Sequence, residues 1–98
     1  MQFILIAYDG TDPEAPERRM KCRGEHLEKI AHVKKRGQFL SGGAILDEKG
    51  AMKGSMIIYE VENRAELDSL LLDEPYISNN VWQKIEIQQF RLATIESK

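Results

Sequence analysis

Near its N-terminus the chain carries a stretch that is apolar on both sides of a predicted strand. Residues 2–8 (QFILIAY) are rich in β-branched and aromatic side chains and end at Asp9-Gly10, a strong turn signal. Successive side chains of a strand point to opposite faces. Both alternate sets are apolar here: Phe3, Leu5 and Ala7 on one face, Ile4, Ile6 and Tyr8 on the other. A sheet built on this strand therefore needs cover on both of its faces.

The size and composition of the chain exclude several classes of protein. Its 98 residues are enough for one domain, spanning residues 1–98, with a modest core. Residues 3–7 form the longest apolar run, far short of the ~20 residues that cross a membrane, so we expect a cytoplasmic protein. A net charge of −2 gives no footprint for nucleic acid. The single cysteine, Cys22, excludes an internal disulfide and disfavours structural zinc.

The remaining pattern predicts six elements in one simple order. They are a strand over residues 2–8, a helix over 17–36, strands over 38–46 and 52–61, a helix over 64–72 and a strand over 81–92. The order βαββαβ predicts an α+β, ferredoxin-like fold, in which two helices cover one face of a four-stranded antiparallel sheet.

Three local expectations follow from apolar spacing. In the first helix, helical spacing predicts an apolar stripe made of Met20, Leu27, Ile30 and Ala31. His26 is expected at the border of this stripe, and Cys22 toward the outer side of the helix. Asn63 is expected to cap the second helix. A change of parity in the last strand predicts a bulge near Gln88-Gln89.

Two helices on one face leave the second apolar face of the sheet uncovered. Residues 56–59 (MIIY) repeat the two-sided pattern of the first strand. The interpretation that we favour is a homodimer formed through the open sheet face, because an exposed apolar sheet is an association surface. The alternative is that a long loop or the C-terminal tail covers it.

His26 is the first candidate for chemistry. Arg23 lies one turn before it and Arg19 two turns before it. A half-desolvated histidine beside cations is suited to act as a general base. The alternative is a histidine that only packs or is solvated. His32 projects away from the apolar stripe and is expected to be a surface residue.

Two further segments could contribute to a site. In Asp73-Glu74-Pro75-Tyr76 a carboxylate next to a rigid proline could orient an imidazole, although acidic residues before proline also commonly end helices. The pair Gly42-Gly43 in a strand indicates a bulge or a close approach of ligand or backbone. Ser41 before it could donate to a ligand or cap that bulge.

Taken together, these segments resemble the YciI family (YCII-related domain). The resemblance rests on Arg23-Gly24-Glu25-His26-Leu27, the Gly-Gly strand, the acidic-Pro-aromatic segment about fifty residues later, and the final Ile-Glu-Ile and Gln-Gln-Phe. It implies a dimeric ferredoxin-like α+β barrel with a histidine/aspartate-centred pocket. It further implies His26 as the base, the carboxylate before Pro75 as its partner and Arg23 as a positive neighbour. The family has aspartate before the proline, whereas this chain has Glu74 there and Asp73 one position earlier.

The function expected from the resemblance is a small enzyme without metal or cofactor, a lyase of the dehydrochlorinase kind or an isomerase, acting on a small anionic organic acid. His26 with Glu74 or Asp73 is expected to be catalytic. The expected substrate contacts are Arg23, Ser41, Gly42 and Tyr76. The alternative is a non-catalytic dimeric module that binds a small ligand or a protein. A third hypothesis is a haem-dependent monooxygenase on the same fold, with His26 or His32 as the iron ligand.

Overall fold

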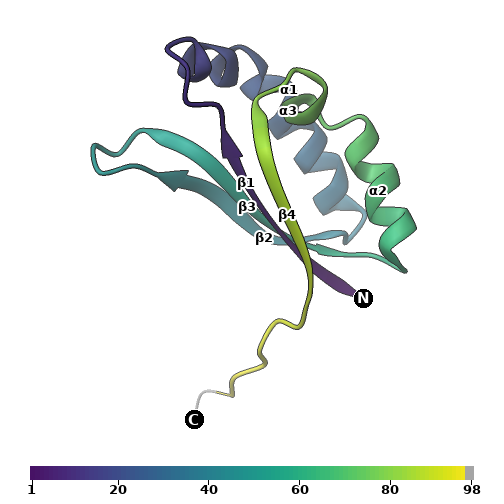
Figure 1. The fold of residues 1–98 in the computed structure, drawn as a ribbon. Helices are drawn as coiled ribbons and strands as arrows, with labels where there is room; N and C mark the ends of the chain where they lie inside the picture. The colour runs from purple at the N-terminus through teal and green to yellow at the C-terminus, as the bar shows by residue number, and fades with distance from the viewer. Residues whose placement is uncertain (97–98) are drawn as a thin grey trace.

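The structure is a computed structural model that describes residues 1–96, so the last two residues of the predicted domain lie outside the described part. It is a four-stranded antiparallel sheet in the order β2-β3-β1-β4, with helices packed on one face (Figure 1). The strands are β1 (Gln2–Asp9), β2 (Phe39–Leu46), β3 (Met52–Glu60) and β4 (Trp82–Phe90). The helices are α1 (Ala15–Lys35), α2 (Arg64–Leu72) and α3 (Pro75–Ser78). The predicted ferredoxin-like α+β fold is confirmed.

The second predicted helix, α2, forms as its sequence indicates. The Asn63 side chain accepts a hydrogen bond from the backbone N–H of Glu66 at 2.9 Å, which caps the first turn. Leu67 and Leu71 are buried against the sheet. The short helix α3 was not predicted, although Pro75 at its first position is a known signal for a helix start.

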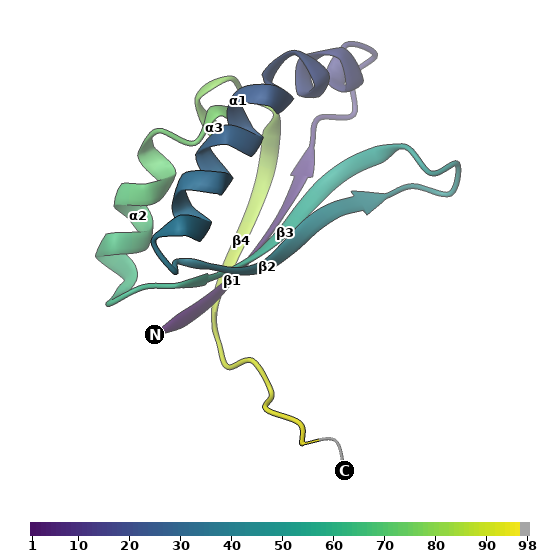
Figure 2. The same ribbon diagram turned by 180° about the vertical axis from the view of Figure 1, so that it is seen from behind.

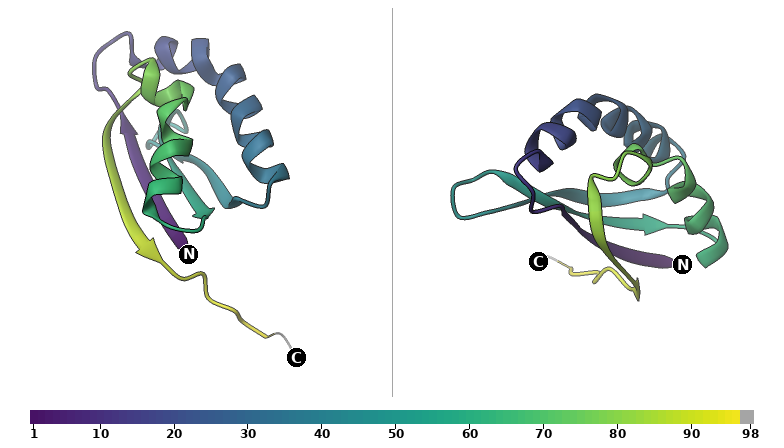
Figure 3. Two further views of the ribbon diagram at one scale, coloured as in Figure 1. Left: turned by 90° about the vertical axis from the view of Figure 1, so that its right-hand side faces the viewer. Right: turned by 45° about the horizontal axis from the view of Figure 1, so that its top comes forward.

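The core lies between the helices and one face of the sheet. The helix layer and the sheet are visible in Figure 3, whose right-hand view shows the helices above the strands. Leu5 and Ala7 of β1 and Leu67 of α2 are fully buried there. No helix in residues 1–96 has the length and apolar character needed to cross a membrane.

The buried face of α1 differs from the predicted stripe. The helix buries Arg19, Cys22, His26 and Val33, while Met20 and Leu27 are 58% and 45% exposed. The expectations of an outward Cys22 and of a border position for His26 are therefore wrong. The physical reason is that Arg19 and His26 have charged partners on other elements, Asp9 on β1 and Glu74 at the start of α3, and these contacts offset the cost of burying the two side chains.

The predicted bulge near Gln88-Gln89 is also wrong. The pairing of β4 with β1 is continuous there, and the register shifts instead at the other end of the strand, where Asp9 pairs with Trp82. The close approach predicted at the glycine pair is confirmed at Gly42. A Cβ atom there would lie 2.7 Å from the Met56 carbonyl oxygen and 3.0 Å from the Phe39 ring.

The second face of the sheet carries the other apolar set. Ile4 lies opposite Ile58, and Ile6 opposite Met56, on the side away from the helices. Residues 91–96 are exposed and run away from the sheet (Figure 2). Within the described residues no helix covers this face, and Tyr8 is 37% exposed.

Tyr59 gives a testable pH dependence of stability. Burial, and secondarily the charge of Glu74, raises the pKa of this tyrosine well above its ordinary value. The raised folded-state pKa contributes stability that is full below the unfolded pKa of about 10 and is lost as the pH rises above it. We expect Tyr59→Phe to flatten the fall in unfolding free energy between about pH 10 and pH 12. Urea unfolding at several pH values measures this, and an unchanged slope contradicts it.

Candidate functional site

His26 and Glu74 meet in the interior although 48 positions separate them in the chain. His26 projects from the middle of α1, and Nδ1 lies 2.5 Å from Oε1 of Glu74. The histidine is 7% and the glutamate 1% exposed. This contact brings together two of the residues predicted to form the site.

The start of α3 determines which acidic residue faces the histidine. Glu74 is the N-cap of α3, and its Oε1 also accepts the backbone N–H of Tyr76 at 3.1 Å. Asp73, in contrast, has a side chain 73% exposed and contacts Lys29 at 2.5 Å. This hydrogen bond to the Lys29 ammonium lowers the pKa of the Asp73 carboxyl. Of the two predicted carboxylates, the structure therefore places Glu74 against the imidazole.

Two aromatic rings hold the imidazole in place. The Tyr76 ring stacks on His26 with centroids 3.9 Å apart and planes at 9°. The Trp82 ring meets the same imidazole edge-on at 5.8 Å. Burial raises the pKa of the Tyr76 hydroxyl, and the positive charges of Arg19 and Arg23 oppose that shift. The imidazole can therefore turn little without losing aromatic contacts and its carboxylate partner.

A second polar group, built around Arg19, lies beside the first. Nη1 of Arg19 donates to both carboxylate oxygens of Asp9, at 2.9 and 3.0 Å. Nη2 donates to the Ser55 hydroxyl at 3.1 Å, and Nε1 of Trp82 donates to the same oxygen at 3.1 Å. The guanidinium also lies 4.8 Å from the centre of the Tyr76 ring. Both groups thus contact Tyr76 and Trp82.

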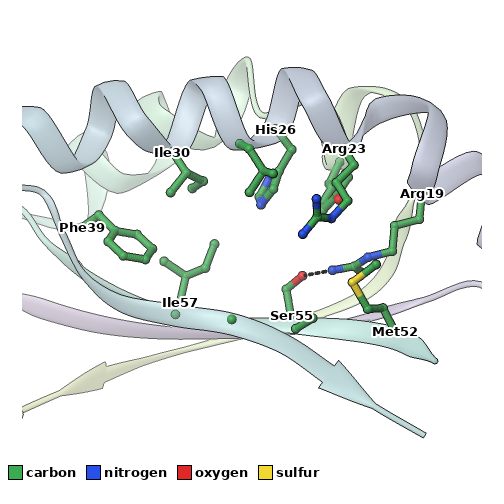
Figure 4. A pocket seen from close by; sticks show the side chains of 13 residues that line it. Arg19, Arg23, His26, Ile30, Phe39, Met52, Ser55 and Ile57 are labelled. Carbon is green, nitrogen blue, oxygen red and sulfur yellow. Dashed lines mark hydrogen bonds between the residues drawn. The ribbon is translucent and has the colours of Figure 1, made fainter. Parts of the chain in front are cut away.

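Arg19, His26, Ser55 and Tyr76 line a cavity of about 140 Å³ between α1 and the sheet (Figure 4). One end is polar, with Arg19, Arg23, His26 and Ser55, and the other is apolar, with Ile30, Phe39 and Ile57. Within residues 1–96 no ion pair involves Arg23, so its charge is available at the cavity. The cavity is suited to a small molecule with an anionic end and an apolar body.

Most of the predicted substrate contacts line this cavity. Arg23, Gly42 and Tyr76 do so. Ser41 does not: it pairs with Ile58 and belongs to the opposite face of the sheet, whereas Gly42 pairs with Ile57 on the cavity side. Ser55 and Arg19 were missed as contacts. The only signal for Arg19 was its spacing from Arg23 and His26, and a lone serine in a strand gives none.

The hydrogen bond at Nδ1 determines what the imidazole can do. With a proton on Nδ1 donated to Glu74, the unprotonated nitrogen of the neutral ring is Nε2. Its lone pair is then free to take a proton from a bound molecule, and the carboxylate stabilises the resulting imidazolium. In the part of the chain that the structure describes, no three His, Cys, Asp or Glu side chains are arranged to hold a metal ion.

Comparison with solved structures identifies proteins of the same fold. A 5-chloro-2-hydroxyhydroquinone dehydrochlorinase from Burkholderia phenoliruptrix, in complex with 2,5-dihydroxybenzoquinone, matches with a TM-score of 0.81 and 20% identity over 95% of this chain and 96% of that one. An antibiotic biosynthesis monooxygenase matches with a TM-score of 0.57 and 19% identity, over 95% and 98% of the two chains. A NIPSNAP domain protein from Burkholderia xenovorans matches over the full length of both chains, with a TM-score of 0.55 and 14% identity.

Comparison with protein families assigns the chain itself. None of the curated proteins matches it significantly. A family model described as the YCII-related domain matches residues 1–91, which include every strand and helix of the structure. The chain therefore belongs to the family of proteins with a YCII-related domain.

Proposed function

We propose that the protein is a lyase or isomerase without a cofactor, in which His26 acts as general base on a small anionic organic acid. The observation that carries this proposal is the buried contact between His26 and Glu74 at the wall of a small cavity. Glu74 orients the imidazole and stabilises its charged form. The free and buried Cys22 supports a reducing compartment such as the cytoplasm.

The proposed reaction begins with proton removal beside a carbonyl group. Nε2 of His26 takes the proton, and the electron pair of the broken C–H bond moves toward the carbonyl oxygen as an enolate. In an isomerase the proton returns to a different carbon. In a lyase the enolate electrons form a new double bond, and a leaving group departs with its bonding pair as an anion. Neither course needs an oxidant or a reductant.

The cavity limits the size and charge of the substrate. A cavity of ~150 Å³ in another protein holds one benzene molecule, so about 140 Å³ suits a single six-membered ring. Arg23 favours an anionic group, and the Phe39 ring with Ile57 offers an apolar wall to the ring body. The dehydrochlorinase of similar fold was solved with 2,5-dihydroxybenzoquinone, an acidic six-membered ring compound that we therefore choose as the probe.

The test is proton exchange at carbon. The protein is incubated with 2,5-dihydroxybenzoquinone in deuterated buffer. A ring carbon of the enol form takes up a deuteron to give the keto tautomer, whose CHD group lies beside a carbonyl and loses its proton to Nε2 of His26, and the loss of ring C–H signal is followed by proton NMR. We expect wild-type protein to accelerate exchange and His26→Gln to lose that acceleration. Binding of the probe with no acceleration by the wild type contradicts the catalytic proposal and favours the alternative, a binding module without turnover.

We also propose that the protein is a homodimer formed through the second face of the sheet. Support comes from Ile4, Ile6 and Met56, which line up across the two central strands without a helix over them. A second copy offers the same apolar surface in a symmetric contact.

The dimer is tested by a charge on that face. Ile6→Lys is expected to give a monomer in size-exclusion chromatography with light scattering, because two lysine side chains would be brought to one apolar interface. Leu72→Lys is the matched control, since Leu72 is 82% exposed on α2. A wild-type monomer at micromolar concentration contradicts the proposal.

A further inference from the structure

Ser55 occupies an unusual position in the hydrogen-bond arrangement of the cavity. It lies in β3, is 3% exposed and lines the cavity floor below α1 (Figure 4). Its Oγ receives two N–H groups, one from Nη2 of Arg19 and one from Nε1 of Trp82, each at 3.1 Å. Guanidinium and indole N–H groups only donate, so the serine oxygen accepts in both contacts.

These two contacts leave the hydroxyl one remaining role. A serine oxygen has two lone pairs and one hydrogen, and both lone pairs are used. Among the hydrogen bonds of residues 1–96, none has the Ser55 hydroxyl as donor. A buried O–H without an acceptor is costly, which favours an acceptor supplied by a bound molecule.

We propose that Ser55 is the oxygen-recognition residue of the cavity, donating its O–H to a carbonyl or oxyanion oxygen of the ligand. This inference rests on the proposed function for the identity of the cavity as a ligand site, and it deepens that proposal by specifying an oxygen acceptor on the ligand. A ligand that presents only a donor at this point leaves the Ser55 hydrogen unpaired.

The surroundings make Ser55 a strong and fixed donor. Arg19 is positively charged and aimed at the serine oxygen, which polarises the O–H bond. Asp9 fixes the guanidinium by accepting two hydrogen bonds from Nη1, and the side chains of Arg19 and Asp9 are 5% and 6% exposed. Trp82 fixes the serine from a second direction. The donor is therefore oriented before a ligand arrives, as oxyanion recognition requires.

The positions of Ser55 and His26 define how a ligand lies in the cavity. Ser55 is on the sheet and His26 is on the helix above it (Figure 4). A ring between them can present an oxygen to Ser55 and a C–H bond to Nε2 of His26. Negative charge that forms on that oxygen as the proton leaves is then stabilised by the Ser55 hydroxyl and, behind it, by Arg19. The ligand class is a small cyclic carbonyl compound or its enolate.

Binding of 2,5-dihydroxybenzoquinone to Ser55 variants tests the inference. Isothermal titration calorimetry gives the dissociation constant for wild type, Ser55→Ala and Ser55→Cys. Loss of a hydrogen bond to a charged acceptor predicts about 10- to 100-fold weaker binding for both variants. Ser69→Ala, which changes an exposed serine on α2, is the matched control and should bind as the wild type does.

Two substitutions of Ser55 are used so that the test does not depend on the folding of a single variant. Ser55→Ala leaves Arg19 and Trp82 without their acceptor and could unfold, whereas the thiol of Ser55→Cys fills the space, accepts weakly and remains a poor donor. Circular dichroism identifies which variant is folded. A folded variant that binds the probe within about twofold of the wild type overturns the inference, given the loss expected for a charged hydrogen bond.

The exchange assay separates this inference from the proposed function. Weakened binding by the Ser55 variants, with no exchange by the wild type, supports oxygen recognition and overturns the catalytic proposal. Exchange that depends on His26, with unaltered binding by the Ser55 variants, overturns the role of Ser55 alone. A wild-type protein that does not bind the probe at millimolar concentration overturns both.

Discussion

Replacing His26 with glutamine is expected to lower the rate of proton exchange on the probe by about 100- to 10,000-fold, the usual contribution of a general base. Glutamine keeps an N–H donor for Glu74, so no carboxylate is left buried without a partner, but it has no basic nitrogen. Exchange measured by NMR at saturating probe gives the ratio. Melting temperature and circular dichroism establish that the variant is folded.

A second histidine on the same helix provides the control. His32 lies in the last turn of α1 and is exposed. His32→Gln makes the same chemical change away from the cavity and should exchange at the wild-type rate. Equal losses from both changes contradict a specific role for His26.

Glu74→Gln separates orientation from basicity. The amide keeps the size of the side chain but removes the negative charge that stabilises the imidazolium, so a loss of at least about tenfold is expected with His26 intact. Asp73→Asn is the neighbouring control, because Asp73 contacts Lys29 at the surface. If Asp73→Asn lowers exchange more than Glu74→Gln, the assignment of the partner carboxylate is wrong.

Replacing Asp9 with asparagine is expected to destabilise the fold by about 3 to 5 kcal/mol, the usual cost of breaking a buried ion pair from one side. The change leaves the Arg19 charge buried without its carboxylate, in a side chain that is 5% exposed. Nε of Arg19 has no partner in the described residues, and the remaining contacts of the guanidinium, with the Ser55 hydroxyl and the Tyr76 ring, are with uncharged groups. Urea unfolding of the two proteins measures the difference.

The adjacent arginine supplies a matched comparison. Arg18 makes the same kind of contact with Asp12, at 2.7 and 3.1 Å, but the Asp12 side chain is 40% exposed. Asp12→Asn should therefore change stability far less, because exposed ion pairs are solvated in both states. Similar effects at Asp9 and Asp12 contradict the structural role given to the buried pair.

Local signals in the sequence predicted the elements of the fold well. The capping residue Asn63 and the leucine spacing predicted the observed limits of α2, and the β-branched and aromatic run at residues 2–8, followed by the Asp9-Gly10 turn signal, predicted β1. Such features act over a few positions and are visible without the fold. The second apolar face of the sheet was likewise visible in β1, where every residue from Phe3 to Tyr8 is apolar or aromatic.

The buried face of α1 could not be predicted in the same way. Apolar spacing favours Met20 and Leu27 as core residues, whereas the helix buries Arg19 and His26. The preference is reversed by polar partners on other elements: Asp9 on β1, Ser55 on β3 and Glu74 at the start of α3. A periodicity rule assigns charged residues to the surface because it cannot include partners that only the fold supplies.

Only part of the candidate site could be predicted from the sequence. The proximity of His26 and the acidic segment was expected from the family resemblance, but the choice between Glu74 and Asp73 depended on the cap of α3. Pro75 at the first helical position was the signal that could have made that choice. The position of Ser55 in the site could not be predicted from the sequence, because the two N–H groups that it accepts come from Arg19 and Trp82 on other elements and not from its neighbours in the chain.

The tautomer of His26 tests the central claim most directly. Nitrogen-15 NMR of labelled protein distinguishes a protonated ring nitrogen from an unprotonated one, and Glu74→Gln helps to assign the signal. The contact with Glu74 predicts that, wherever the ring is neutral, its proton lies on Nδ1 and Nε2 is bare, and that the Nε2 signal shifts when 2,5-dihydroxybenzoquinone binds. A neutral ring that carries its proton on Nε2, with no response to the probe, contradicts the assignment of His26 as the base.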